Sequence, residues 1–484
     1  MDNTIHWRGE HEHEEEINDE VETDPAYELL LPGEHSNAYR DRLKRPPWYK
    51  RSAYILLCAA ALLFISTVLY TIDVFSGYSL RKTLSSASNN YIGSVVSHLW
   101  PEGMANRTDN WENENSKTMH ALFKCLANGG CGENQTSIVL LSSPHFKDSI
   151  AGHTSGEDIW AISILLSLKE MGYTAVYAPH NSELLRTYRQ YPDLVKIIIS
   201  EGSDAESCFK DPQCTKTKDH PLGIPAWKML AMHFWTGSSH PLGNQWTLSP
   251  ENFPLLSPGN SKDNVYLGYS VERACKEIPI TPMDERPNQG FVYGKRLDYF
   301  FGKDFAWEGV SFVAPFPIQL VAGFSNDSSV LSPPPEGIDN MGVMPKHRFY
   351  EHLGMSRVLI GIGRPVLSPT PYDALCMGVP FINPIMHWDK KKPDDRSKWE
   401  AQHDGLKYES PPYVYNVKKG DGEGLWRAVK DALDHPIDRY IVPNMTMASL
   451  GARLGALVEK DWKSQAEQLL ELRKKTGKGE LFEI

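Results

Sequence analysis

Apolar runs and segments with helical spacing alternate along most of the chain after residue 135. The run Thr136–Ser143 is apolar and β-branched, which predicts a buried strand. The next segment has helical spacing and ends at Gly172; its apolar positions are Ile159, Ile162, Leu165, Leu166 and Leu168. Short strands are then predicted at TAVYAP and at Leu194–Ser200. Strand, loop, helix and strand in this order predict the βαβ units of a doubly wound parallel sheet.

The same alternation returns in the second part of the chain. It predicts strands at Gly290–Tyr293, at residues 310–316 and in the run that ends at Ile362, with helices in HRFYEHLGM and AVKDALDHP. We therefore expect an α/β protein with two Rossmann-like domains, residues 135–285 and 286–450, facing a cleft. Residues 451–484 predict a charged amphipathic C-terminal helix.

One apolar stretch differs from all the others. Ser52–Ile72 carries no charged residue, and about 20 apolar residues span a bilayer as a helix. A buried core helix is the alternative, but the length of the run favours lipid. A cleaved signal peptide fits less well, because the stretch begins only at residue 52. We expect a single transmembrane helix over residues 52–74.

Charge sets the orientation of that helix. Residues 1–39 are acidic and predict a disordered tail, and a basic block follows; its members are Arg40, Arg42, Lys44, Arg45, Lys50 and Arg51. The positive-inside rule places residues 1–51 in the cytosol and the remainder in the lumen, as in a type II signal anchor. Residues 75–134 are polar and predict a lumenal stem. The net charge of −11 argues against nucleic-acid binding.

Cysteines and glycosylation sequons agree with a lumenal location. Cys125 and Cys131, like Cys208 and Cys214, have the spacing of local disulfide loops, although free thiols are the alternative and six lumenal cysteines allow 15 pairings. The sequence has no zinc-type cysteine spacing. Sequons occur at Asn106, Asn134, Asn326 and Asn444.

The segment Gly361–Pro384 has the outline of a ligand-binding turn. Gly361 and Gly363 permit a tight turn, and Pro369 and Pro371 stiffen the chain before a helix that Thr370 could cap. Amide groups at such a helix start attract phosphate, and Asp373 could accept hydrogen bonds from ribose hydroxyls. The sixth position of a dinucleotide fingerprint is Val366 instead of glycine, and a Walker A loop is missing. A sugar-linked mononucleotide fits better, while an ordinary strand–turn–helix is the alternative.

The segment VLIGIGRPVLSPTPYDALCMGVPFINP resembles the donor site of glycosyltransferase family 18, the α-1,6-mannosylglycoprotein 6-β-N-acetylglucosaminyltransferases. The stretches AGHTSGEDIWAISILLSLKEMGY, WTLSPENFPLLSPGNSKDNVYLGYSVE, GFVYGKR and AQHDGLKYESPPYVYNV resemble further family segments in the right order, over about residues 137–453. The family's donor-helix glutamate is Asp373 here, and the family's Cys-rich extension has no match in this sequence. The resemblance implies a GT-B fold, with acceptor binding by residues 135–285 and nucleotide-sugar binding by residues 286–450.

The resemblance also implies roles for single residues. Glu157 matches the family's catalytic base. When the resemblance is set aside, the alternative is a carboxylate that only stabilises the start of a helix. His153 is an alternative base. Lys295 would reach the diphosphate, with an ordinary surface lysine as the alternative. Arg364 could assist, although the family pattern places no arginine there. Gly363, Pro369, Thr370, Pro371 and Asp373 would complete the donor site.

Trp246 and Phe253 would bind the acceptor, with core packing as the alternative reading. His403 could touch either substrate, or could be an ordinary loop histidine. The sequence lacks a D-x-D motif, so we expect no metal requirement and no cofactor beyond the donor UDP-GlcNAc.

We therefore expect a Golgi type II membrane enzyme that transfers N-acetylglucosamine to a mannose 6-hydroxyl of an N-glycan or glycoprotein, with inversion. A membrane-anchored glycan-binding or inactive relative is the alternative, and a lumenal dehydrogenase is a third reading. Saturable UDP binding without turnover would favour the second reading, and NADH binding the third.

Overall fold

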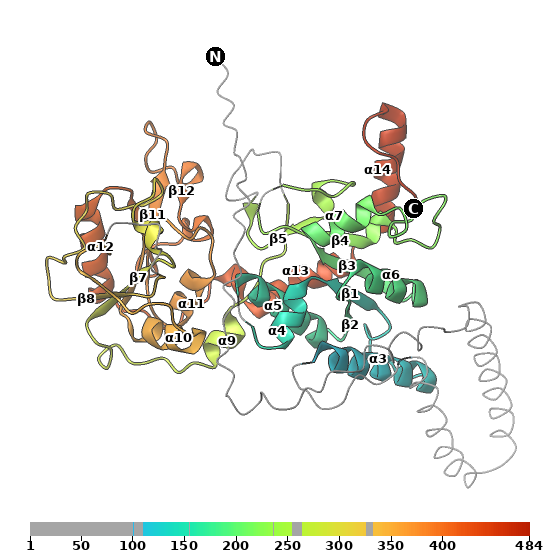
Figure 1. Ribbon diagram of the computed structural model, residues 1–484, viewed down its shortest axis with the longest axis horizontal. Helices are drawn as coiled ribbons and strands as arrows, with labels where there is room; N and C mark the ends of the chain where they lie inside the picture. Colours follow the sequence, from blue (N-terminus) through green and yellow to red (C-terminus); the bar gives the residue numbers. More distant parts are fainter. Residues whose placement is uncertain (1–99, 101–109, 154, 236, 254–263, 326–332) are drawn as a thin grey trace, which may run out of the picture. The chain divides into compact units, whose positions relative to one another are not determined.

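The computed structural model describes residues 100, 110–153, 155–235, 237–253, 264–325 and 333–484 (Figure 1). The chain divides into two compact units, Met1–Ser88 and Asn89–Ile484, and all described residues belong to the second. The expected membrane helix at 52–74, the acidic tail and most of the expected stem lie outside the described residues. Among the residues that are described, no helix combines the length and the apolar character needed to cross a bilayer.

The N-terminal half is built on a six-stranded sheet with strand order β2-β1-β3-β4-β5-β6. All of its strand pairs are parallel. Its strands are β1 (Ile138–Ser142), β2 (Thr174–Tyr177), β3 (Val195–Glu201), β4 (Met229–Met232), β5 (Thr247–Ser249) and β6 (Val265–Tyr266). Every residue of β1 and β2 is buried, as expected for strands covered by helices on both faces.

Helices far apart in the sequence cover this sheet (Figure 1). They are α3 (Trp111–Asn128), α4 (Pro144–Ile150), α5 (Gly156–Glu170), α6 (Asn181–Gln190), α7 (Gly202–Lys210), α13 (Met447–Glu459) and α14 (Trp462–Thr476), whereas α9 (Glu272–Lys276) packs against α11 (Thr370–Cys376) of the other half. Helix α13 packs on α5, and Trp462 at the start of α14 contacts Trp246 with ring centroids 5.4 Å apart. The end of the chain therefore belongs to the N-terminal half, as two helices where the sequence predicts one.

Helix α3 lies within the segment assigned to a stem. Met119, Leu122 and Phe123 are buried at helical spacing in a mostly polar sequence. The Asn115 side chain donates to the Tyr177 carbonyl at 2.7 Å and accepts from the Tyr177 amide at 2.9 Å. Residues 111–128 are thus part of the folded half, because a narrow apolar stripe is enough to dock a helix on a sheet.

The C-terminal half is built on a seven-stranded sheet. The strand order is β12-β11-β10-β7-β8-β9, with β13 beside β11, and only the β11–β12 pair is antiparallel. Its strands are β7 (Gln289–Tyr293), β8 (Gln319–Ala322), β9 (Ile338–Asn340), β10 (Val358–Gly361), β11 (Phe381–His387), β12 (Glu400–Ala401) and β13 (Val414–Lys418). Its helices are α10 (Lys346–Met355), α11 (Thr370–Cys376) and α12 (Gly422–Asp434). Short 3-10 turns in the two halves are Ala226–Lys228, Asn244–Trp246, Leu297–Phe300, Arg396–Lys398, Asp404–Leu406 and Pro443–Met445.

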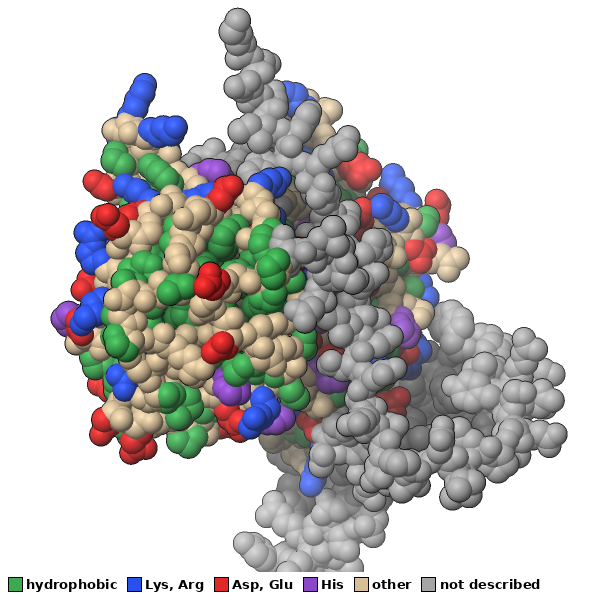
Figure 2. All heavy atoms as spheres, turned by 60° about the vertical axis from the view of Figure 1, so that its left-hand side comes forward, with side chains coloured by type: hydrophobic (Ala, Val, Ile, Leu, Met, Phe, Trp, Pro, Cys, Tyr) green, Lys and Arg blue, Asp and Glu red, His purple; other side chains and the backbone are tan. Residues whose placement is uncertain are grey.

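The strand predicted at residues 310–316 is wrong. That segment is irregular, and the chain joins the sheet only at β8. Pro315 and Pro317 lack an amide hydrogen, so the segment cannot form a continuous ladder. On the face shown in Figure 2, apolar side chains lie among backbone atoms and other uncharged side chains, with acidic and basic side chains between and around them. Scattered exposed apolar side chains of this kind are normal on a protein surface.

Three disulfides stabilise the fold. Cys125–Cys131 and Cys208–Cys214 confirm the two local loops predicted from spacing. The third bond, Cys275–Cys376, joins α9 to α11 across a sequence separation of 101. It therefore ties the N-terminal half to a helix of the C-terminal half.

Candidate functional site

The predicted base, Glu157, lies in the first turn of α5. Ser155 caps this helix: its side chain accepts from the Asp158 amide at 3.1 Å, while the Ser155 amide donates to Asp158 Oδ2 at 2.8 Å. This capping box fixes the turn that carries Glu157. The Glu157 side chain is half-buried, whereas His153, the alternative base, is exposed.

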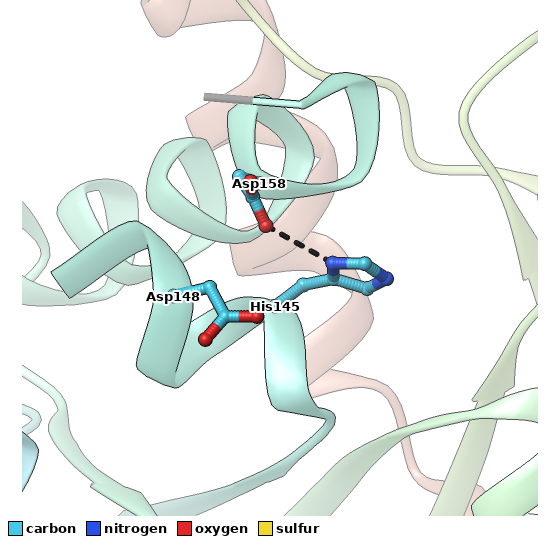
Figure 3. Close-up of side chains that lie close together, drawn as sticks. All are labelled: His145, Asp148 and Asp158. Atoms are coloured by element: carbon cyan, nitrogen blue, oxygen red, sulfur yellow. Dashed lines mark hydrogen bonds and ion pairs between the residues drawn. The ribbon is translucent and has the colours of Figure 1, made fainter. Parts of the chain in front are cut away.

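Asp158 also binds a histidine that the sequence analysis did not single out (Figure 3). His145, at the start of α4, lies 3.0 Å through Nδ1 from Asp158 Oδ1. Burial alone would lower the pKa of His145, but the hydrogen bond to Asp158 and the negative charges of Glu201 and Glu157 raise the pKa above its ordinary value. The position of His145 in the sequence could have pointed to it. His145 comes three residues after the end of β1, and in open α/β sheets ligands bind at the carboxyl ends of the strands.

The same region contains a group of possible metal ligands. In the described part of the chain, ligand atoms of His145, Asp148 and Asp158 lie within 4.8 Å of one another (Figure 3). The hydrogen bond between His145 and Asp158 already occupies one ligand atom of each. A metal bound here would have to displace that proton.

The glycine turn after β10 is tightly packed. Gly363 has φ 106° and lies so close to the Asp304 carbonyl that a side chain would collide with it. The Gly363 amide donates to Gln402 Oε1 at 2.9 Å. Arg364 donates to Asp304 Oδ2 from Nε at 2.9 Å and from Nη2 at 2.7 Å. These contacts show that the turn is held by the protein's own groups.

Helix α11 carries the predicted donor-site carboxylate. Pro369 stands at its N-cap, Thr370 and Pro371 form its buried start, and Asp373 is 3% exposed. Burial raises the pKa of Asp373 to about 7, and Lys346 and the Tyr350 hydroxyl oppose this shift. Within the described residues, Asp373 Oδ1 has no hydrogen-bond partner. A buried carboxylate oxygen without a partner is costly to the fold, and a ligand hydroxyl would satisfy it.

The start of α5 and the start of α11 meet. A Cβ built on Gly156 would lie 3.3 Å from the Pro369 ring, so the residue before Glu157 contacts the donor-helix turn of the other half. A second link lies nearby in sequence: the Tyr372 hydroxyl donates to the Glu251 carboxyl group at 3.3 Å. Burial raises the pKa of Glu251 to about 8. The two predicted parts of the site therefore lie at one junction between the halves.

Three other predicted residues differ in exposure. The Lys295 side chain is exposed after β7. Trp246 is 1% exposed, and its Nε1 donates to the Trp227 carbonyl at 3.1 Å, so the side chain is part of the core. Phe253 is 6% exposed. These placements favour core packing for Trp246 and Phe253, the alternative reading, over contact with an acceptor sugar.

His403 and the sequons differ in accessibility. His403 is buried against Tyr372, with ring centroids 4.7 Å apart, and burial lowers its pKa to about 3. Asn444 is exposed, whereas the half-buried Asn134 donates from Nδ2 to the Met171 carbonyl at 2.9 Å. Asn106 and Asn326 lie outside the described residues.

Comparison with known proteins adds a family match. The sequence model described as Glycosyltransferase family 18 matches residues 225–470. Alpha-1,6-mannosylglycoprotein 6-beta-N-acetylglucosaminyltransferase A from Homo sapiens is 28% identical over 150 residues, as is its counterpart from Cricetulus griseus. The matched stretch is 31% of this chain and 19% of each relative, so most of the relatives' length is not covered.

Solved structures resemble the chain only distantly. Anabaena Alr3699/HepE in complex with UDP has a TM-score of 0.38 and 8% identity, over 70% of this chain and all of that one. Spinosyn forosaminyltransferase SpnP has a TM-score of 0.33 and 12% identity, over 71% of this chain and all of that one. These values are too low to bear on the function of this chain.

Proposed function

The chain belongs to glycosyltransferase family 18 and is a glycosyltransferase, and we propose that it transfers N-acetylglucosamine from UDP-GlcNAc to a mannose 6-hydroxyl of a glycan. The observation that carries this proposal is the contact of Gly156 with Pro369, which joins the turn bearing Glu157 to the helix bearing Asp373. In a GT-B enzyme, donor and acceptor meet between two such halves, and the two parallel sheets agree with that arrangement.

The proposed chemistry is a single displacement. Glu157 removes the proton of the acceptor hydroxyl as its oxygen attacks the anomeric carbon, and the bond from that carbon to the diphosphate breaks. The electron pair of the broken bond leaves on UDP, and the configuration inverts. The half-buried position of Glu157 allows it to touch an acceptor while the capping box holds its backbone in place.

The donor would lie against the C-terminal half. Asp373 Oδ1, buried and without a partner among the described residues, would accept a hydrogen bond from a ribose hydroxyl of the donor. The proposed reaction uses no metal ion or other cofactor. We further propose a single-pass type II Golgi location with the enzyme domain in the lumen, supported by the uncharged apolar stretch 52–72 and the basic block before it.

The test uses the full chain in detergent micelles with labelled UDP-GlcNAc and a panel of mannose-containing glycans, followed by linkage analysis of the product. Wild type should form a β-1,6 product, and Glu157→Gln should lower kcat by about 10²- to 10⁴-fold, the usual contribution of a general base. Glu183→Gln is the control, because Glu183 is a surface residue of α6 that pairs with Arg186. Equal turnover of wild type and Glu157→Gln would remove Glu157 from the mechanism. Wild-type UDP binding without transfer to any glycan would refute the proposed reaction.

A further inference from the structure

Lys346 interacts with charged groups of both halves. It is the first residue of α10, is half-buried, and its Nζ lies 4.8 Å from the centre of the Tyr350 ring one turn later. An ammonium over an aromatic face is stabilised there, which keeps a flexible side chain in a defined place. The Tyr350 ring therefore favours a position of the Lys346 ammonium beside the first turn of α10.

The surroundings of Lys346 come from both halves. The Tyr350 hydroxyl hydrogen-bonds the Asp373 carboxyl group, and Lys346 is the cation whose charge acts on Asp373. The charge of Asp158, at the start of α5, also acts on Lys346. The ammonium thus lies within electrostatic range of the donor helix and of the turn that presents Glu157.

A second observation points to a ligand at this place. Asp373 is 3% exposed, and its Oδ1 makes no hydrogen bond within the described part of the chain. A ligand that donates a hydrogen bond to Asp373 Oδ1 would bring its charged groups close to Lys346.

The cations expected from the sequence are placed less favourably. Arg364 is held at a different carboxylate, because its Nε and Nη2 both donate to Asp304 Oδ2. Lys295 is exposed, and a solvated ammonium stabilises an anion less than a half-buried one does.

Resting on the proposed function, we propose that the Lys346 ammonium binds the diphosphate of the nucleotide-sugar donor and neutralises the charge that develops on the leaving UDP. Lys346 keeps its proton throughout. The proton lost by the acceptor goes to Glu157, and the electron pair of the broken carbon–oxygen bond stays on the terminal phosphate oxygen of UDP. A preorganised cation of this kind acts most strongly in the transition state, where the leaving group gains charge.

The experiment compares UDP with uridine, which lacks the diphosphate. Affinities of the full chain in detergent micelles are measured by calorimetry for wild type, Lys346→Met, Lys295→Met and Lys430→Met. Lys430 is the matched control, because it is a lysine of α12 that pairs with Asp434 on the surface. In Lys346→Met the ratio of UDP affinity to uridine affinity should fall by about tenfold or more, with uridine affinity unchanged. Lys430→Met should keep the wild-type ratio.

The outcomes separate this inference from the proposed function. If wild type prefers UDP over uridine and Lys346→Met keeps that preference, Lys346 does not bind the diphosphate, and the proposed function survives. If wild type shows no preference for UDP, both fail. Thermal unfolding monitors the fold, and Lys346→Gln, which keeps a polar side chain of similar length, serves the same test if Lys346→Met does not fold.

Discussion

Removal of the Cys275–Cys376 disulfide should destabilise the protein more than removal of a local one. Cross-linking restricts the unfolded chain, and the entropy cost grows with the logarithm of the loop length. For the separation of 101 residues the chain-entropy relation gives about 4.7 kcal/mol at 25 °C. For Cys208–Cys214, with a separation of 6, it gives about 2.2 kcal/mol. The expected difference in the free energy of unfolding is therefore about 2.5 kcal/mol.

The two pairs are well matched for this comparison. All four cysteines are at most 1% exposed, so each double alanine variant loses buried sulfur of the same kind. Urea titration followed by tryptophan fluorescence, without reducing agent, gives the free energy of unfolding for wild type and both double variants.

A functional measurement accompanies the stability measurement. Cys376 lies in α11, three residues after Asp373, so only Cys275→Ala/Cys376→Ala should also weaken UDP binding. Equal stability losses in the two double variants, or a larger loss for Cys208→Ala/Cys214→Ala, would refute the loop-length reasoning. An unchanged UDP affinity in Cys275→Ala/Cys376→Ala would show that the bond does not position α11.

Two further predictions concern titration and modification. Burial raises the pKa of Glu251 from 4.5 to about 8. Between these pH values the folded protein keeps a proton that the unfolded chain releases. The free energy of unfolding of the wild type therefore falls as the pH rises through this range. The free energy of unfolding of Glu251→Gln relative to wild type should therefore rise from pH 5 to pH 8, by at most about 1.4 kcal/mol per pH unit, and a difference that does not change with pH would contradict this. Asn444 is exposed within a sequon, so Asn444→Gln from a secretory host should lose the mass of one glycan, and an unchanged mass would show that the site is not used.

Local signals in the sequence were sufficient for the sheet cores. β1 and β10 are short apolar runs, and β3 contains the apolar run Ile197–Ile199; such runs form strands wherever helices can cover them. The segment at 310–316 has the same apolar character but contains Pro315, and Pro317 follows it directly. There the missing amide hydrogens outweigh the hydrophobic pattern.

Contacts between distant residues could not be predicted in the same way. The pairing of Cys275 with Cys376 depends on how α9 meets α11, which no local spacing encodes. Trp246 illustrates the same limit. From the sequence alone, an aromatic residue in a polar loop is a reasonable candidate for stacking on a sugar. Only the fold shows that Trp246 packs against Trp462, near the end of the chain. Lys346 was overlooked because its neighbours Asp373 and Asp158 come from different parts of the sequence.

The distribution of charge at the junction gives the proposed reaction a direction. In the N-terminal half, Asp148, Asp158 and Glu201 surround one histidine, and Glu157 adds a further carboxylate. This surface repels a diphosphate and suits a neutral acceptor hydroxyl. Across the junction, Lys346 offers a cation beside the buried Asp373 carboxyl group. Under the proposed function an anionic donor is therefore favoured on the C-terminal half alone, which orients its anomeric carbon toward Glu157 before the acceptor binds.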